Sequence, residues 1–248
     1  MTFTINCAAA SLYAKPDEKS TRVDEVLHGM EMEIEAEDGD WLYVHTSYRY
    51  KGWLHRCHLI EKLEQSSHYV SVAAADVLVA PKVQATLIEC LTLGCTVYVI
   101  SREESGWAKV ALTDGRTGFI RAAFLKEFPG KITREAVCQT AKLYMGSQYR
   151  WGGKSPLGID CSGLCFMAYW LNGVSIYRDA RIVEGFAVKE ISLAKAQMGD
   201  LVFFDGHVGM LVEDGGMLHA SADGNGVGVE GFVGKWLDRL IGVGSVFC

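Results

Sequence analysis

The sequence lacks several features that would place it in a special class of protein. No apolar run approaches the roughly 20 residues that a membrane-spanning helix needs. Only 4 of its 248 residues are proline and 49% are hydrophobic, which excludes a disordered or collagen-like chain. The formal net charge is −6, whereas a nucleic-acid partner would require a basic face. We therefore expect a globular protein of one to three domains with no membrane span and no nucleic-acid partner.

The eight cysteines include no C-x-x-C pair, which argues against zinc ribbons and thioredoxin-type redox sites. A chain of this length can build its core without disulfides. We therefore predict that seven of the eight are buried, reduced thiols that act as small hydrophobic residues. The cysteines are Cys7, Cys57, Cys90, Cys95, Cys138, Cys161, Cys165 and Cys248.

The N-terminal segment MTFTINCAAASLYAKP has neither a basic n-region nor a long apolar stretch. It does not resemble a secretory signal, so the sequence as it stands predicts a cytoplasmic protein. A secreted protein from which the signal had been removed would show the same pattern.

The first half of the chain contains a tandem repeat. Trp41 and Gly52 recur as Trp107 and Gly118, and short β-rich runs alternate with Asp-Gly turns in both copies. We predict two small β-barrels, one at residues 1–64 and one at 65–128. The first has 7 basic and 12 acidic residues, a local charge of −5 that suits a cationic ligand but is also typical of a solvated surface.

Residues 129–248 have a different pattern, which indicates an α+β domain. A first helix is predicted from a cap at Thr133 to Gly146, and an apolar second helix opens at Asp160-Cys161 and ends at Asn172-Gly173. Residues 178–198 show no clear pattern. The rest is predicted to form strands at 201–204, 208–212, 217–220, 226–229 and 241–247.

Cys161 is the candidate nucleophile, because it lies where the second helix begins. A helix N-terminus lowers the pKa of a thiol through its dipole and free N–H groups, and the thiolate is the attacking species. Asp160 suits the helix cap, and the backbone N–H groups of Cys161 or Ser162 are candidate oxyanion donors. Cys165 lies one turn further along an apolar face and is interpreted as core.

A nucleophilic thiol needs a base and a group that orients the base. The only histidines of residues 129–248 are His207 and His219, on predicted strands joined by the turn 213–216. Neighbouring strands are about 5 Å apart, so the two rings would meet if the register allows. The sequence does not determine that register.

Other interpretations of the same residues stay open. A cysteine at a helix start and two strand histidines are, taken singly, more often structural, and Cys161, His207 and His219 are also a possible zinc set. The run 55–58 (HRCH) resembles a metal cluster in composition only and is interpreted as a solvated end of the first barrel. The repeated tryptophans are explained better by core packing than by ligand stacking; they are Trp41, Trp53 and Trp107.

Several motifs follow one another along residues 149–220: Tyr149-x-Trp151-Gly152-Gly153, Asp160-Cys161-Ser162-Gly163, Gly199-Asp200-Leu201-Val202-Phe203-Phe204, His207-Val208-Gly209 and His219-Ala220. In this order they resemble the NlpC family of cell-wall cysteine peptidases. The preceding repeat resembles the paired bacterial SH3-like domains of the YkfC-like subgroup. The resemblance implies a papain-like catalytic domain at 129–248 after two SH3-like barrels. It also implies that Cys161 is the nucleophile, His207 the general base and acid, and His219 the residue that orients His207.

The resemblance further implies an activity. Family members cleave peptidoglycan stem peptides, and the subgroup releases L-Ala-γ-D-Glu from peptides (muropeptides) with a free N-terminal L-Ala, without a metal or organic cofactor. On this basis the residues lining the substrate site are Tyr149, Trp151, Asp160 and Ser162, with Asp160 helping to hold the substrate ammonium. Tyr50 and an acid of the loop 16–18, Asp17 or Glu18, would contribute from the first barrel.

Two functions other than peptidase activity stay open. A non-catalytic module that binds wall peptides would use the SH3-like pair and keep the C-terminal domain as a scaffold, which would need none of the Cys161, His207 and His219 set. An amidase or acyltransferase on the same fold would use the same residues on another substrate.

Overall fold

A computed structural model describes residues 2–62, 66–224 and 226–247 of the chain. The chain divides into two compact units, Met1–Phe128 and Pro129–Cys248. The predicted boundary between residues 64 and 65 lies outside the described residues, as does Cys248. No helix within the described ranges has both the length and the apolar character to cross a membrane.

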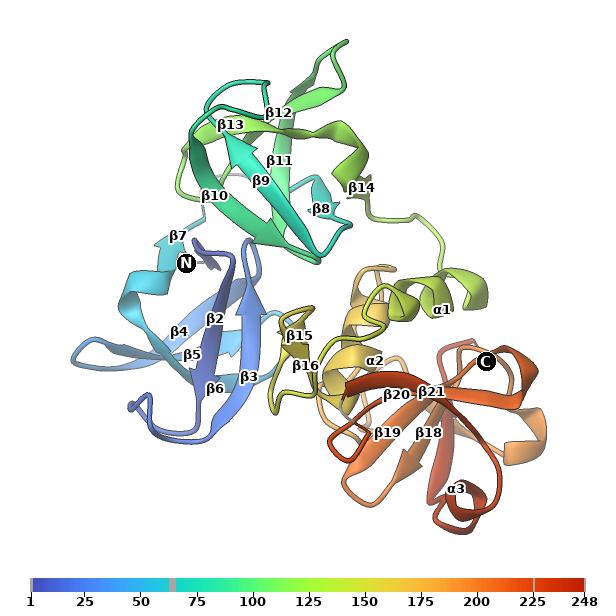
Figure 1. Cartoon of the computed structure of the whole chain (residues 1–248). Coiled ribbons are helices and arrows are strands. Elements are labelled where there is room, and N and C mark those ends of the chain that lie inside the picture. The colour runs from blue at the N-terminus through green and yellow to red at the C-terminus, as the bar shows by residue number, and fades with distance from the viewer. Residues whose placement is uncertain (1, 63–65, 225, 248) are drawn as a thin grey trace. The chain divides into compact units, whose positions relative to one another are not determined.

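The first unit contains two antiparallel sheets with the same strand order (Figure 1). The first sheet runs β3-β2-β6-β5-β4-β1-β7 and the second β10-β9-β13-β12-β11-β8-β14, so each strand of one matches the strand seven places later in the other. The predicted tandem repeat is therefore confirmed. The strands of the first sheet are β1 (Phe3–Ile5), β2 (Ala9–Tyr13), β3 (Arg22–Leu27), β4 (Glu31–Asp38), β5 (Trp41–Thr46), β6 (Lys51–His55) and β7 (Leu59–Glu61). Those of the second are β8 (His68–Val70), β9 (Ala74–Leu78), β10 (Leu87–Thr92), β11 (Thr96–Arg102), β12 (Trp107–Ala111), β13 (Thr117–Arg121) and β14 (Leu125–Glu127).

The repeated glycines occupy crowded positions in both sheets. A Cβ at Gly52 would lie 2.9 Å from the Cβ of Leu12, and one at Gly118 would lie 2.6 Å from Cγ1 of Val77. Ordinary Cβ contacts are longer than this, so both strands need a residue without a side chain here. The shared spacing of the two copies thus has a packing reason.

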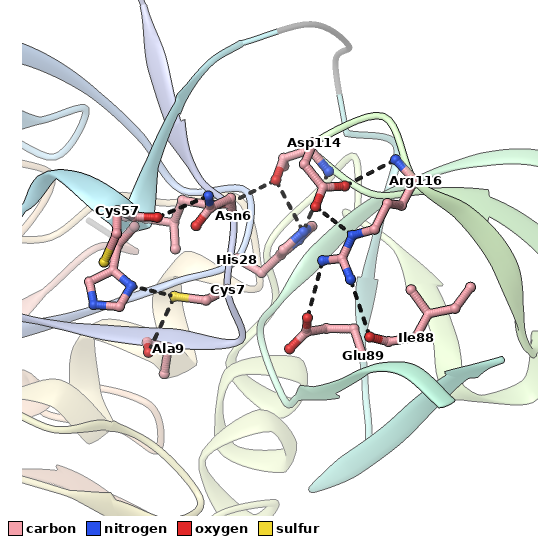
Figure 2. Close-up of polar contacts among 12 residues, drawn as sticks. Asn6, Cys7, Ala9, His28, Cys57, Ile88, Glu89, Asp114 and Arg116 are labelled. Atoms are coloured by element: carbon pink, nitrogen blue, oxygen red, sulfur yellow. Dashed lines mark hydrogen bonds and ion pairs between the residues drawn. The ribbon is translucent and has the colours of Figure 1, made fainter. Parts of the chain in front are cut away.

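The two sheets of the first unit meet around His28, which is fully buried (Figure 2). Its Nδ1 lies 2.8 Å from the carbonyl oxygen of Thr96, and its Nε2 lies 3.1 Å from the hydroxyl of Thr113. Burial lowers the pKa of His28. The neutral ring therefore joins the first sheet to two segments of the second.

The seven described cysteines are all free thiols. Cys95, Cys138 and Cys165 are buried as predicted, and so is Cys161. The prediction is wrong for the other three, since Cys57 and Cys90 are exposed and Cys7 is half-buried. Cys57 lies in the 3₁₀ turn η1 (Arg56–His58), which has no buried residue. Cys90 lies on the outward face of β10.

The second unit packs helices on a six-stranded antiparallel sheet of order β17-β22-β18-β19-β20-β21 (Figure 1). The sheet contains β17 (Lys189–Ile191), β18 (Leu201–Phe204), β19 (His207–Leu211), β20 (Gly216–Ser221), β21 (Gly226–Gly231) and β22 (Gly242–Ser245). The remaining elements are α1 (Arg134–Lys142), α2 (Cys161–Trp170), α3 (Lys235–Asp238), the short pair β15 (Lys154–Ser155) and β16 (Gly158–Ile159), and three 3₁₀ turns, η2 (Ala122–Phe124, in the first unit), η3 (Leu193–Lys195) and η4 (Glu213–Gly215).

The predicted elements of this unit are confirmed with small shifts at their ends. Helix α1 starts after its Thr133 cap as predicted but ends at Lys142, and turns continue to Gly146. Helix α2 begins at Cys161, and it packs against β19 and β20. The segment without a predicted element contains β17, whose three residues are too few to show a pattern.

Candidate active site

The start of α2 is held by the side chain of Asp160. Its Oδ1 accepts a hydrogen bond from the backbone N–H of Gly163 at 2.6 Å, and its Oδ2 accepts one from Gly152 at 2.7 Å. A capping carboxylate satisfies N–H groups that have no partner within the helix. The cap also links the Gly-rich segment to the helix, which places Cys161 at a defined point.

A buried arginine completes this arrangement. Arg178 is 1% exposed, and its two Nη atoms each lie 3.0 Å from one oxygen of Asp160. Nη1 of Arg178 also donates to the hydroxyl of Ser162 at 2.8 Å, and that hydroxyl donates to Asp160. Sequence reasoning missed Arg178, because it lies in the segment without a recognisable pattern. The carboxylate of Asp160 is therefore paired within the chain.

The Cys161 thiol is only 5% exposed and is surrounded by polar groups. The backbones of Val208 and Ser162 hydrogen-bond to its sulfur, and so does the side chain of Tyr149. Burial and the charge of Asp160 nevertheless raise the pKa of Cys161 to about 11. The expected lowered pKa is wrong for this state of the protein, because loss of hydration outweighs the donors of the helix start. The resting thiol is protonated at neutral pH.

Tyr149 shares the environment of the thiol. Its backbone bridges to Ile159, just before the helix cap, and its side chain is half-buried. Burial, with the nearby Cys161 and Asp160, raises the pKa of its hydroxyl to about 12. Tyr149 is therefore a neutral hydrogen-bonding group at the sulfur.

The two histidines of this unit do meet. Met210 pairs with Leu218 across β19 and β20, so His207 and His219 lie on one face of the sheet, offset diagonally. Nε2 of His207 lies 2.8 Å from Nδ1 of His219. Burial lowers the pKa of both rings, and that of His207 falls to about 4 with a contribution from His219. Both rings are therefore neutral at pH 7.

Further side chains enclose the histidine pair. Trp236 of α3 stacks on His207, with ring centroids 5.7 Å apart and planes at 27°, and contacts His219 edge-on. Glu230 of β21 lies 3.4 Å from Nε2 of His219 and accepts a hydrogen bond from Nε1 of Trp236 at 2.9 Å. Sequence reasoning missed both, since neither belongs to a local motif.

A narrow pocket with room for about one water molecule lies beside the start of α2. Ser162 lines one side of it and Val208, the residue after His207, another. Two charged side chains, Asp179 and Arg181, also line the cavity. Most of the other lining residues are apolar, and they include Ile176, Val188 and Phe203.

The remaining sequence candidates are placed as follows. Trp151 is 62% exposed on the second unit. Asp17 and Glu18 are exposed in the β2–β3 turn and Tyr50 is half-buried, all on the first unit, so their substrate roles stay predictions. Across the described ranges, no three or more His, Cys, Asp or Glu side chains are grouped so that they could hold a metal ion, which leaves the zinc hypothesis without support.

The chain is similar to several known proteins. The NlpC/P60 family model matches residues 146–244. The chain is 45% identical to dipeptidyl-peptidase 6 of Lysinibacillus sphaericus over 89% of its length and 88% of that protein. It is 30% identical to the γ-D-glutamyl-L-lysine dipeptidyl-peptidase of Bacillus subtilis over 82% of its length and 73% of that protein.

A solved structure shows the same fold. The crystal structure of an NlpC/P60 family protein from Bacillus cereus superposes with a TM-score of 0.86, covering 98% of each chain at 20% identity. At that identity the likeness concerns the fold alone. The two sequence relatives span most of the chain, and both are dipeptidyl-peptidases by name. The chain therefore belongs to the NlpC/P60 family.

Proposed function

We propose that this protein is a cysteine peptidase that hydrolyses the bond between γ-D-glutamate and an L-diamino acid in peptidoglycan stem peptides. The release of L-Ala-γ-D-Glu from peptides with a free N-terminal L-Ala would serve recycling of wall peptides. The names of the two relatives support a dipeptidyl-peptidase of this kind. The observation that carries the proposal is the place of the Cys161 thiol at the capped start of α2. There its sulfur is hydrogen-bonded to the backbone of Val208, the residue after His207.

The chemistry starts from neutral groups. Because the resting thiol is protonated and His207 is neutral, His207 accepts the thiol proton as the sulfur attacks the γ-carbonyl carbon. The resulting imidazolium donates that proton to the leaving amine as the C–N bond breaks, which leaves a thioester on Cys161. His207 then deprotonates a water molecule that attacks the thioester, and the sulfur recovers its proton.

The oxyanion of each tetrahedral intermediate needs hydrogen-bond donors. The first N–H groups of a helix have no partner within it. The N–H of Cys161 therefore suits this role, as does that of Ser162, whose hydrogen bond is to the reacting sulfur itself. The Tyr149 hydroxyl, which is bonded to the sulfur, is a third donor at the same place. Gly163 does not contribute, because its N–H is bonded to Asp160.

The predicted substrate residues divide into two groups. We assign Ser162 and Tyr149 to direct contact with the substrate, with Trp151 at the exposed rim. Both oxygens of Asp160 already accept hydrogen bonds from Arg178 and from the backbone, which favours a role in holding the helix start over binding of the substrate ammonium.

The first unit supplies the finer part of the proposal. We infer that its two sheets are SH3-like barrels, since the repeated strand order and the subgroup resemblance agree. Tyr50 and either Asp17 or Glu18 would then recognise the substrate amine, a role that suits the excess of acidic residues in residues 1–64.

The test is hydrolysis of L-Ala-γ-D-Glu-L-Lys, and of its diaminopimelate counterpart, by the full chain. Cys161→Ala should abolish release of L-Ala-γ-D-Glu, whereas Cys90→Ser, at an exposed thiol, should not change it. Acetylation of the substrate N-terminus should block cleavage. Binding without turnover by the unaltered protein would favour a wall-binding module, and turnover of amides or acyl acceptors alone would favour an amidase or acyltransferase.

A further inference from the structure

The histidine pair ends on an acidic side chain that has no role in the proposed chemistry so far. Glu230 of β21 pairs with Met217 of β20. His219 is two residues after Met217 on the same strand, so Glu230 and His219 lie on the same face of the sheet. Its Oε1 is 3.4 Å from Nε2 of His219. Three polar side chains on neighbouring strands thus form one row from His207 through His219 to Glu230.

The carboxylate of Glu230 is itself held in place. Its Oε2 accepts a hydrogen bond from Nε1 of Trp236 at 2.9 Å and lies 3.5 Å from Nζ of Lys235. The hydrogen bond from Trp236 lowers the pKa of Glu230, so the group is ionised at neutral pH. An ionised carboxylate only accepts hydrogen bonds.

This property determines where each imidazole carries its proton. Facing a carboxylate, Nε2 of neutral His219 must carry the proton, which leaves Nδ1 of His219 as an acceptor. The 2.8 Å contact then requires Nε2 of His207 to donate. The remaining nitrogen, Nδ1 of His207, keeps the lone pair that a general base needs.

We propose that Glu230 is a positioning residue that fixes the tautomers of His219 and His207 and so leaves Nδ1 of His207 as the base, with Trp236 holding both the carboxylate and the rings. The Trp236 ring stacks on His207 while its N–H bonds Glu230, so one side chain orients both ends of the row. The assignment goes beyond the Cys161, His207 and His219 set. The kinetic effects expected of Glu230 rest on the proposed function, whereas the assignment of the histidine tautomers does not.

Charges around the row give the sign of the pH effect. Glu230 raises the pKa of both rings, whereas Arg239 lowers that of His207 and Lys235 that of His219. The neighbouring His219 also lowers the pKa of His207. Removing the Glu230 charge should therefore move the acidic limb of the kcat/KM profile to lower pH, because the base then protonates later.

The first test measures tautomers in the unaltered full chain by ¹⁵N NMR of its imidazoles at pH 7, with His207→Gln and His219→Gln used for assignment. We expect both rings to be protonated at Nε2. A His207 ring protonated at Nδ1 would overturn the proposal. This measurement does not depend on any activity, so it remains decisive if the proposed substrate is not cleaved.

The second test is kinetic. Glu230→Gln should lower kcat by about 10- to 100-fold with little change in KM, as the loss of a carboxylate partner does at metal-bound histidines, and should shift the acidic limb to lower pH. Glu230→Asp should recover part of the loss, and Trp236→Phe, which keeps a ring but loses the N–H, should show an intermediate loss.

Glu190→Gln, at an exposed site on β17, is the matched control and should behave as the unaltered enzyme. An unchanged kcat and acidic limb in Glu230→Gln would refute the assignment, and if that variant does not fold, Trp236→Phe and the NMR measurement decide it.

Discussion

Arg178 and Asp160 form a two-point ion pair at the start of the helix that carries Cys161, with both N–O distances at 3.0 Å. Both residues are buried, at 1% and 6% exposure. Removing one partner of a buried pair leaves the other charge without compensation, which typically costs far more than the net value of the pair. The pair therefore makes the position of the helix start sensitive to a single substitution.

Asp160→Asn should lower the free energy of unfolding of the second unit by about 3–5 kcal/mol, because Arg178 stays buried without its counter-charge. Thermal or urea unfolding measures the change. Asp205→Asn, at an exposed carboxylate of the same unit, is the control and should have little effect. An Asp160→Asn protein as stable as the control would show that the ion pair contributes nothing.

A glycine on β19 provides the space that Met217, two residues before His219, needs. A Cβ at Gly209 would lie 2.6 Å from Cγ and Sδ of buried Met217 and 3.4 Å from the Cβ of His219. Gly209→Ala should therefore cost about 1–3 kcal/mol, as overpacking of a core does, and should lower kcat, because relief of the clash with Met217 would shift β20, which also carries His219. Gly228→Ala on β21 adds the same methyl group where no atom lies within 4 Å, so unfolding and turnover should hardly change. Equal effects of the two substitutions would contradict the packing argument.

The sequence predicted those parts of the fold that depend on local rules. The two copies of the repeat were recognisable because Gly52 and Gly118 meet the same steric requirement in both sheets. The start of α2 was recognisable because a capping Asp precedes an apolar helix. The meeting of His207 and His219 could be named as a possibility, but only the register of β19 and β20 decides it.

The missed residues share a different physical origin. Arg178 and Glu230 act through contacts with residues distant in sequence, and no spacing rule connects them to Cys161 or His219. The direction of the Cys161 pKa was also missed, because a helix start indicates donors but not the degree of burial. Burial depends on the packing of the whole unit, which a single sequence does not show.

Acidification should destabilise the second unit through His207. The pKa of His207 is about 4 in the folded protein, below its ordinary value of 6.5, so between these pH values the unfolded chain binds more protons than the folded one. The stabilisation is complete above pH 6.5 and is lost progressively as the pH falls toward 4. Tm measured from pH 7.5 to 4.5 should fall less steeply in His207→Gln than in the unaltered protein. Parallel curves would show that His207 does not contribute.

In the first unit, His28 joins the two sheets and should be the most sensitive point of their contact. Its ring bonds the Thr96 carbonyl and the Thr113 hydroxyl, and the backbone N–H of Thr96 donates to the His28 carbonyl at 2.9 Å. Figure 2 shows the ring close to the Asp114–Arg116 pair. His28→Ala removes the ring and leaves buried polar groups unpaired, which should cost about 2–4 kcal/mol.

Amide hydrogen exchange of the full chain can localise this effect. In His28→Ala the amides of Thr96 and Thr113 should exchange faster, whereas that of Leu164 in α2 should keep its protection because it belongs to the other unit. His45→Ala removes a half-buried ring of the first sheet that pairs only with Glu35 at 3.7 Å among the contacts described for it, and it should leave Thr96 protected. If the His28 ring stabilises the contact between the two sheets, it must slow the opening of that contact. Unchanged exchange at Thr96 in His28→Ala would therefore mean that backbone and hydrophobic contacts hold the sheets together without the ring.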